Sequence, residues 1–254
     1  MNNFYITHNI FIKEKKYFFE NEKDNTIIKL NKKNWFKYLT EYGWERLCIN
    51  WRKRLKETNK SCFGILDCGS NGDCLFHVLS DALNSKFILN NNEPLYDYEN
   101  LRLIASKEIN SDNFELILNS YKLEKELNEF NGDWDPDSIN SIEDLQRQIT
   151  TCGDNFWGDH ILLQLLQKKL EFNVIILNSD NYSNSDNIED RFKIMPIASL
   201  NLDNYKYTII IYYLEEIHFQ LIGYFDGNKM ITLFEKNELP PIILDIYNND
   251  CRNN

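Results

Sequence analysis

The sequence lacks several features that mark common classes of protein. Its longest strongly apolar run, residues 207–214, is far too short to cross a lipid bilayer. It has no internal repeat and no Pro-rich or Gly-rich linker that would divide it into domains. Its first residues lack the basic start, apolar centre and small-residue cleavage site of a secretory signal. For 254 residues we therefore expect one large domain, or one domain with an appendage.

Paired cysteines and an excess of basic charge are also absent. None of the six cysteines forms a C-x-x-C pair, so the usual zinc-binding spacing is missing. We predict a reduced, cytoplasmic protein with no metal and no other cofactor. The 28 Lys and Arg residues are outnumbered by 39 Asp and Glu residues, for a net charge of −11. Such a chain is a poor binder of nucleic acid and of anionic membranes, so we predict neither as a partner. It suits a partner with a basic face.

The hydrophobic pattern predicts an α+β fold. Hydrophobic residues make up 43 % of the chain, enough for a sizeable core. Helices are predicted mainly in the first two thirds, over residues 32–58, 74–83, 101–109, 114–130 and 159–170. Strands are predicted late, over residues 174–177, 207–214, 218–224 and 230–234, and a short apolar stretch covers residues 63–66. Residues 1–30 are expected to be irregular, with short β-like runs. The aromatic residues of 32–58 either pack on the main domain or form a partner-binding helix.

Cys74 is the strongest candidate for chemistry. It follows a polar, Gly-containing turn and begins a predicted helix. A helix N-terminus presents unpaired N–H groups and a partial positive charge, which stabilise a thiolate. The same turn can direct N–H groups at an oxyanion. The alternative is a buried structural cysteine, and the local pattern does not separate the two.

A thiolate nucleophile needs a general base, and the chain has four histidines. His218 begins a predicted strand after a short acidic turn, a rigid position from which its ring can reach a facing helix. His77, three residues after Cys74, would lie beside the sulfur rather than across a cleft. His160 is expected to cap a helix or face solvent, and His8 lies in the weakly structured start. His218 is therefore the preferred base.

Three blocks of the sequence, taken together, resemble the ovarian tumour (OTU) family of cysteine deubiquitinases. Residues 71–76, Asn-Gly-Asp-Cys-Leu-Phe, resemble the family's nucleophile motif, which usually reads Asp-Gly-Asn-Cys, then an apolar residue and an aromatic one. Trp157-Gly158 before a helix and a strand resembles a second block. Residues 217–222, Ile-His-Phe-Gln-Leu-Ile, resemble a third, in which the catalytic His precedes an aromatic residue. The blocks occur in the family's order and extend over about residues 61–234.

The resemblance implies a papain-like fold, with a small, mostly antiparallel sheet packed between helices. It implies an N-terminal, partly helical extension over residues 1–60, an OTU-like protease domain over 61–234 and a C-terminal tail over 235–254. It also implies a cysteine isopeptidase that removes ubiquitin, polyubiquitin or a ubiquitin-like modifier through a thioester acyl-enzyme.

The resemblance also assigns roles to individual residues. Cys74 would attack the carbonyl of the ubiquitin C-terminal glycine. His218 would take the thiol proton and later protonate the leaving lysine amine. Backbone N–H groups of Gly72, Asp73 and Cys74 would form the oxyanion hole.

Three further residues would contact the substrate. Trp157 and Gly158 are expected to form walls of a narrow channel for the Gly-Gly tail, and Phe219 follows the base. A core position for Trp157 is the alternative, and the two roles are compatible.

The nucleophile block departs from the family pattern in one respect. The acid and the amide of Asp-Gly-Asn are exchanged, to give Asn71-Gly72-Asp73. Asn71 can still bond the turn through its side chain. Asp73 would raise the pKa of the adjacent Cys74 thiol unless its carboxylate points away or caps the helix.

The histidine block departs from the pattern in another respect. The residue two positions after His218 is usually Asp or Asn, and here it is Gln220. A Gln carbonyl can accept the ring N–H but carries no charge. Asp67, upstream of the nucleophile turn, is the other candidate for the third catalytic residue. Weak support of the imidazole reduces the rate without abolishing it.

Two other functions stay open on the sequence. One is an OTU-fold module that binds ubiquitin but turns over little or nothing. The other is a papain-like hydrolase acting on other acyl substrates. We expect a monomer in the cytoplasm. The Asn-rich composition suggests an AT-rich genome and is the basis of a further hypothesis: a large DNA virus or an intracellular bacterium as the source, and the host cytosol as the site of action.

Overall fold

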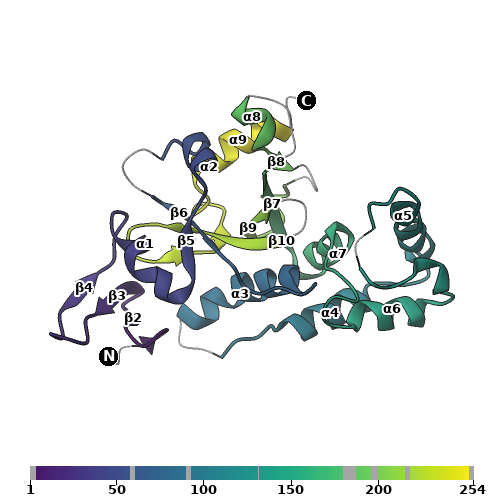
Figure 1. The fold of residues 1–254 in the computed structure, drawn as a ribbon, viewed down its shortest axis with the longest axis horizontal. Coiled ribbons are helices and arrows are strands. Elements are labelled where there is room, and N and C mark those ends of the chain that lie inside the picture. The colour runs from purple at the N-terminus through teal and green to yellow at the C-terminus, as the bar shows by residue number, and fades with distance from the viewer. Residues whose placement is uncertain are drawn as a thin grey trace.

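A computed structural model of the chain describes residues 4–57, 61–89, 93–130, 132–179, 187–195, 200–214 and 218–251. Within these ranges the protein contains a small N-terminal sheet, a larger central sheet and helices on both faces of the central sheet (Figure 1). None of its described helices has the length and hydropathy that a membrane span requires.

The N-terminal residues form an antiparallel sheet. Its strands pair in chain order: β1 Phe4–Tyr5, β2 Ile10–Lys13, β3 Lys16–Glu20 and β4 Ile27–Lys29. The prediction of an irregular start was therefore wrong, although the short β-like runs were real strands. The turn between β2 and β3 explains the error. Its central residues, Glu14 and Lys15, both have positive φ, at 51° and 58°, in a position where Asn-Gly is the usual sequence signal.

The central sheet is mostly antiparallel. Its strands are β5 Trp44–Arg46, β6 Phe63–Leu66, β7 Phe172–Ser179, β8 Ile194–Met195, β9 Tyr207–Leu214, β10 His218–Phe225, β11 Met230–Ile231 and β12 Leu233–Glu235. The order is β5-β6-β10-β9-β7-β8, with β11 beside β10 and β12 beside β9. The parallel pair is β7 with β9, and the other described pairs are antiparallel. This confirms the predicted α+β class.

Helices cover both faces of the central sheet. The longer ones are α3 Cys74–Leu89, α4 Tyr98–Lys107, α5 Phe114–Glu126, α6 Ile142–Thr150, α7 His160–Leu170 and α9 Pro241–Cys251. The shorter ones are α1 Trp35–Tyr38, η1 Leu39–Tyr42, α2 Ile49–Arg54, η2 Pro136–Ser138 and α8 Ile188–Arg191. In Figure 1, α3 lies below the sheet, α2, α8 and α9 lie above it, and α4 to α7 extend to one side. The predicted sheet between helices is confirmed.

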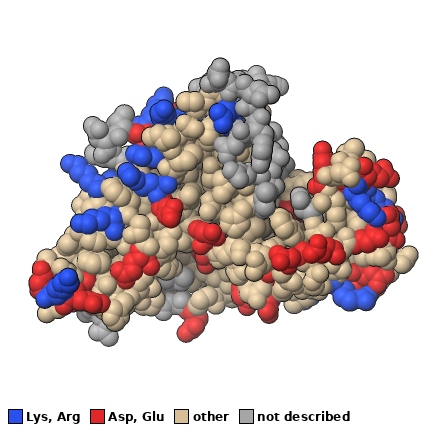
Figure 2. All heavy atoms as spheres, viewed as in Figure 1, with Lys and Arg blue, Asp and Glu red and all other residues tan. Residues whose placement is uncertain are grey.

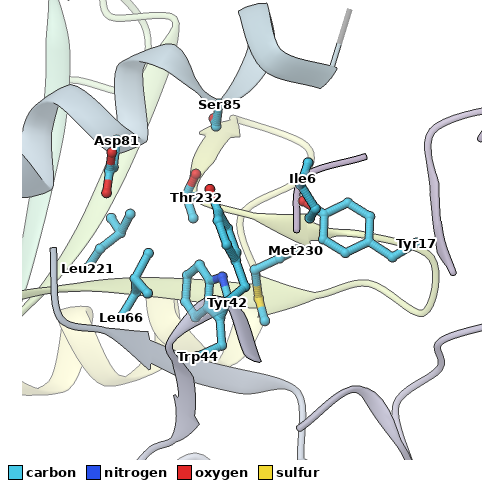
Figure 3. Close-up of a pocket in the computed structure, with 10 residues that line it drawn as sticks. All are labelled: Ile6, Tyr17, Tyr42, Trp44, Leu66, Asp81, Ser85, Leu221, Met230 and Thr232. Atoms are coloured by element: carbon cyan, nitrogen blue, oxygen red, sulfur yellow. The ribbon is translucent and has the colours of Figure 1, made fainter. Parts of the chain in front are cut away.

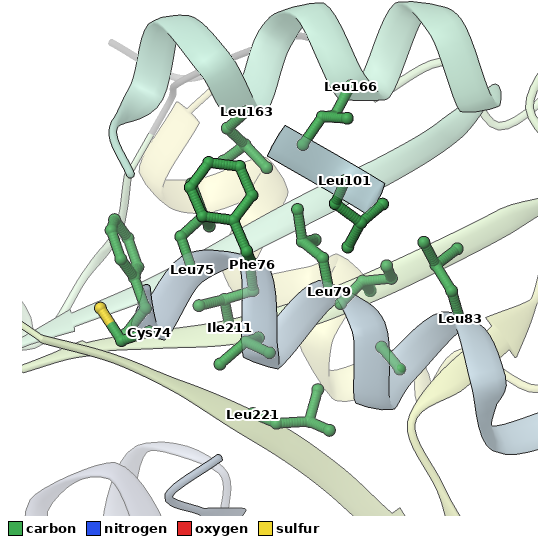
Figure 4. Packing of buried hydrophobic residues seen from close by; sticks show 14 of the residues in the cluster. Cys74, Leu75, Phe76, Leu79, Leu83, Leu101, Leu163, Leu166, Ile211 and Leu221 are labelled. Atoms are coloured by element: carbon green, nitrogen blue, oxygen red, sulfur yellow. The ribbon is translucent and has the colours of Figure 1, made fainter. Parts of the chain in front are cut away.

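Two apolar cores follow from the alternation of side chains along the strands. Ile209 and Ile211 of β9 belong to the core between the sheet and α3. Ile210 and Tyr212 belong to the core between the sheet and helices α2 and α9. Successive side chains of a strand point to opposite faces, so an unbroken apolar run is buried on both sides. Figure 4 shows the first core, where Leu75, Leu79 and Leu83 of α3 meet side chains from α4, α7 and the sheet.

The long helix predicted over residues 32–58 is not formed. The segment is divided into α1, η1, β5 and α2, and Gly43, with φ of +85°, ends η1 in a left-handed conformation. Its aromatic residues pack on the main domain, which was one of the two alternatives expected from the sequence. Trp35, Trp44 and Trp51 are at most 3 % exposed. Strand β5 joins the central sheet through β6. The predicted domain boundary near residue 60 therefore falls between two strands, β5 and β6, that are hydrogen-bonded to each other in one sheet. The boundary itself stays a prediction.

Other boundaries differ from the predictions in smaller ways. Helix α3 continues to Leu89, beyond the loop expected from residue 84. The residues expected as a C-terminal tail include α9, which buries Ile243, Ile246 and Tyr247. Strand β7 extends to Ser179, beyond the predicted strand end at residue 177, and residues 180–186 lie outside the described part of the chain. The acidic turn of residues 215–217 lies outside it as well.

Candidate active site

Cys74 is the first residue of α3, next to the turn of residues 67–73. The carbonyl of Asp73 accepts the N–H of His77 at 3.0 Å, so the helical hydrogen-bonding pattern begins directly before Cys74. Unpaired backbone N–H groups and the positive end of the helix dipole belong to this position. Cys74 is 5 % exposed and lies at the end of the core in Figure 4.

The turn before Cys74 is oriented by hydrogen bonds on one side. The carbonyl of Gly72 accepts the backbone N–H of Gly158 at 3.1 Å and the guanidinium of Arg102 at 3.3 Å. A trans peptide is planar, so the N–H of Asp73 points in the opposite direction to this carbonyl. Within the described part of the chain no hydrogen bond occupies that N–H. It is thus available as an oxyanion donor beside Cys74.

Two consecutive residues of the turn adopt the left-handed conformation. Asn71 has φ of +62° and Gly72 has φ of +78°. Asn tolerates this region better than most residues, and glycine adopts it without strain. A Cβ on Gly72 would lie 2.3 Å from the carbonyl oxygen of Gly153, so a side chain is also excluded by space. Asn71 itself is exposed and accepts the Ser70 hydroxyl at 3.2 Å.

A buried ion pair fixes Asp73. Its carboxylate accepts the Nε–H of Arg102 at 2.6 Å and the backbone N–H of Gly153 at 2.8 Å. The guanidinium is fully buried and also donates to the carbonyls of Ile149 at 2.9 Å and Phe156 at 2.7 Å. The negative charge that the exchanged motif places beside the nucleophile is therefore paired with a positive charge. We call these contacts the Arg102 network.

Sequence reasoning missed Arg102 and Gly153. Arg102 lies next to Leu101 on α4, a helix whose buried face otherwise carries small or apolar side chains and Ser106. An arginine on a buried helix face needs a paired acid, because a buried charge is costly when it is unpaired. That pattern, together with the unusual Asp73, is a signal that could have linked the two residues.

His218 lies between Cys74 and Asp67. Its Nε2 atom is 3.1 Å from Oδ1 of Asp67. Interaction with the Cys74 side chain and, secondarily, with the Asp67 carboxylate raises the pKa of His218, against the opposing effect of partial burial. The His218 side chain is 22 % exposed and that of Asp67 is 61 % exposed. Cys74, His218 and Asp67 thus lie in the order that a nucleophile, a base and an acid would need.

Gln220 occupies a different position from Asp67. It lies on the same face of β10 as His218, yet its Oε1 atom is buried without a hydrogen-bond partner among the described residues. The structure therefore brings Asp67, rather than Gln220, into contact with the imidazole. Asp67 is placed by its own turn, where Oδ1 also accepts the N–H of Gly69 at 3.2 Å.

The predicted substrate contacts occupy three kinds of position. Trp157 is half-buried, and its Cδ1 atom is 3.2 Å from the place where a Cβ on Gly72 would lie. A Cβ on Gly158 would lie 2.8 Å from Cβ of Leu75, so the glycine is explained by close packing against α3. Phe219 is 6 % exposed and stacks on Tyr213, a core position instead of the expected substrate surface.

The other histidines lie outside this group. His77 packs against Tyr98, with ring centroids 4.6 Å apart. His160 is exposed in the first turn of α7, where Asp159 is the N-cap and accepts the N–H of Leu162 at 2.9 Å. His8 is exposed and pairs with Glu22.

Three of the other cysteines are disfavoured as nucleophiles. Burial raises the pKa of the thiols of Cys68, Cys152 and Cys251, which disfavours their thiolates. In the described ranges, no three His, Cys, Asp or Glu side chains are grouped so that they could hold a metal ion.

Comparison with known proteins adds a likeness of fold. No protein-family model matches the sequence, and no curated protein matches it. The fold is similar to that of solved OTU domains. The OTU domain of OTUD1 shares 12 % identity at a TM-score of 0.41, over 68 % of this chain and 91 % of that one. An OTU domain in complex with ubiquitin shares 16 % sequence identity at a TM-score of 0.41. The match covers 74 % of this chain and 86 % of that one. A ubiquitin-bound OTU deubiquitinase of Wolbachia pipientis wMel shares 14 % sequence identity at a TM-score of 0.41. The match covers 69 % of this chain and 98 % of that one.

Proposed function

We propose that this protein is a cysteine isopeptidase that removes ubiquitin or a ubiquitin-like modifier from proteins or chains. The observation that carries the proposal is the position of His218 between the Cys74 thiol and the Asp67 carboxylate. A base that contacts a helix-terminal thiol and is oriented by a third group is the arrangement that nucleophilic catalysis needs.

The first chemical step is attack by Cys74 on the carbonyl of the C-terminal glycine. His218 holds the thiol proton, and Asp67 orients the ring and stabilises the imidazolium. The N–H groups of Asp73 and Cys74 stabilise the oxyanion. Collapse of the tetrahedral intermediate breaks the C–N bond, and His218 delivers its proton to the leaving lysine amine. A thioester between Cys74 and the glycine remains.

The second step is hydrolysis of that thioester. His218, now neutral, takes a proton from water, and the resulting hydroxide attacks the thioester carbonyl. The same N–H groups stabilise the second oxyanion. The C–S bond then breaks, the free carboxylate leaves, and Cys74 and His218 return to their starting states.

The choice of ubiquitin is supported by the sequence motifs and by charge. The three blocks that resemble the OTU family contain Cys74, Trp157 and His218. Acidic side chains gather along the side of the molecule below α3 and α4 and around α5 (Figure 2). Because ubiquitin has arginines in its tail and basic residues around its apolar patch, an acidic surface complements it. We propose a monomer that acts in the cytoplasm, or in a host cytosol if the source is viral or an intracellular bacterium.

Hydrolysis of ubiquitin carrying a C-terminal fluorogenic amide, and of ubiquitin chains, tests the proposal. Wild type is expected to release fluorophore and free ubiquitin, and Cys74→Ala to release neither. If wild type instead binds ubiquitin without cleaving it, and binding survives Cys74→Ala, the protein is an OTU-like binding module. If a general thiol reagent labels Cys74 but ubiquitin neither binds nor is cleaved, the substrate is a different acyl group.

A further inference from the structure

A small pocket lies away from the catalytic residues, between α3 and the segment that joins the two sheets. Its walls include Asp81 and Ser85 of α3, Tyr42 of η1, Trp44 of β5, and Met230 and Thr232 beside the hairpin after β10. In Figure 3, α3 passes above the pocket and Tyr42 and Trp44 lie below it. Asp81 follows Cys74 by seven residues, so it lies about 10 Å farther along the helix axis.

Three side chains of this pocket carry oxygens that can accept hydrogen bonds, beside the hydroxyls of Tyr17 and Tyr42 and the indole N–H of Trp44. Thr232 is 5 % exposed, and its Oγ1 atom has no hydrogen-bond partner among the described residues. Ser85 donates its hydroxyl proton to the carbonyl of Ala82 at 2.7 Å, so its lone pairs face outward as acceptors. Asp81 contributes a carboxylate. An alkylammonium group has three N–H donors and no acceptor, which matches these three oxygens.

The charge and the aromatic walls favour the same kind of ligand. No Lys, Arg or His is among the described residues that line the pocket, and the ionisable groups near Asp81 outside the lining are Cys68 and His77. Tyr42 and Trp44 present aromatic rings, which attract cations through their π-faces. One carboxylate beside two rings is an environment for a cation with an apolar stem.

The volume limits how much of a ligand can enter. The pocket holds about 50 Å³. A site that holds one water molecule measures about 10–15 Å³ on the same scale, so the space admits an ammonium or methylammonium head and leaves the chain to extend into solvent. We propose that this pocket binds the ammonium head of an alkylamine, either a lysine side chain of a bound protein or a free amine. The proposal is independent of the isopeptidase activity.

Methionine-methyl NMR offers a direct test, because the chain has three methionines and Met230 lines the pocket. Protein labelled at the Met methyl groups would be titrated with n-butylammonium, with neutral n-butanol and with Nα-acetyl-lysine methylamide. The Met230→Leu variant assigns the signal, and Met195, outside the pocket lining, is the internal reference.

The expected result is a saturable shift of the Met230 signal with both ammonium compounds. Asp81→Asn should weaken that binding by about tenfold or more, because a hydrogen bond to a charged group is lost. Tyr42→Leu should weaken butylammonium more than butanol. Asp245→Asn, an exposed helical carboxylate on α9, is the matched control and should change nothing.

Two results would overturn the assignment. One is an equal response to butanol and butylammonium, which would indicate an apolar hollow. The other is no shift, or a shift that Asp81→Asn leaves unchanged, which would indicate a pocket that holds only water. If the ammonium compounds do bind, tighter binding of butylammonium points to a free amine, and tighter binding of the lysine derivative points to a protein side chain.

Discussion

Arg102, which holds the nucleophile turn, is fully buried, whereas Asp67, which contacts the base, is 61 % exposed. On the nucleophile side, Asp73 and the carbonyl of Gly72 are both bonded to Arg102, and neighbouring contacts come from buried backbone. On the base side, one hydrogen bond at the surface joins Asp67 to His218. The position of the nucleophile is thus part of the folded core, and the support of the base is open to water.

This difference separates two kinds of effect. A buried charge that loses its partner costs several kcal/mol, because the remaining charge is desolvated and unpaired. An exposed pair is screened by water and contributes little to folding. We therefore expect changes on the nucleophile side to reduce both stability and rate, and changes on the base side to reduce mainly the rate.

The largest effect on stability is expected for Arg102→Met. It leaves the Asp73 carboxylate and two carbonyls without their buried donor, so the free energy of unfolding should fall by about 3–5 kcal/mol. Urea denaturation measures this. Arg147→Met is the matched control: its side chain is 73 % exposed and pairs with Asp144, so it should cost no more than about 0.5 kcal/mol.

A double variant sharpens the same prediction. Asp73→Asn combined with Arg102→Met removes both charges, so its cost should be smaller than the sum of the two single costs. Additive costs would contradict a direct ion pair. A loss below 1 kcal/mol for Arg102→Met alone would show that the nucleophile side is no more firmly held than the base side.

Two glycines on the nucleophile side form a pair for comparison. Gly72 and Gly153 have similar φ angles of +78° and +84°, but a Cβ on Gly153 meets nothing closer than 3.9 Å. Gly153→Ala should therefore cost about 1–2 kcal/mol through left-handed strain alone. Gly72→Ala should cost about 1–3 kcal/mol more, because its Cβ would overlap the Gly153 carbonyl. Equal losses in urea denaturation would refute the close approach of the two loops.

On the base side, Asp67→Asn should lower kcat/KM for the fluorogenic ubiquitin amide by about 10–100-fold, with little change in the free energy of unfolding. The reason is that the imidazolium loses a charged hydrogen-bond partner, worth about 1.5–3 kcal/mol in the transition state. Gln220→Ala should leave kcat/KM within about twofold. The reverse order of effects would identify Gln220 as the third catalytic residue.

The smallest effect is a pH dependence of stability. The pKa of His218 is raised in the folded protein, mainly by its hydrogen bond to Cys74. A group whose folded pKa exceeds the unfolded value stabilises the fold fully below the unfolded pKa, about 6.5, and loses this contribution as pH rises through the folded pKa. Urea denaturation should thus show wild type losing stability relative to His218→Gln as the pH rises above about 6.5. Parallel pH profiles for the two proteins would argue against the contact. Cys74→Ser should reduce the difference.

The sequence singled out Cys74 and His218, the proposed nucleophile and base, because both lie where local signals are strong. Cys74 begins a helix with a clear apolar face after a Gly turn, and His218 begins a strand rich in apolar residues. Periodicity and turn chemistry are local properties, and they also predicted most of the central strands.

Long-range partners could not be predicted in the same way. The Arg102 network joins residues 29 to 80 positions apart, and no local pattern records which buried carbonyl a guanidinium will meet. The sequence left both Asp67 and Gln220 as candidates for the third catalytic residue. Which of them contacts the imidazole depends on how β6 and β10 pair. The N-terminal sheet was missed because Glu14 and Lys15 form a turn that these residue types rarely make.

The most direct test of the account is the reaction with full-length ubiquitin bearing a C-terminal thiol-reactive group, read by intact mass. Wild type, Cys74→Ala, His218→Ala and Asp67→Ala would be compared after each is shown to be folded. The account predicts one ubiquitin adduct on wild type, none on Cys74→Ala, a strongly slowed reaction for His218→Ala and a moderately slowed one for Asp67→Ala. No adduct on folded wild type, or an adduct that persists in Cys74→Ala, would contradict it.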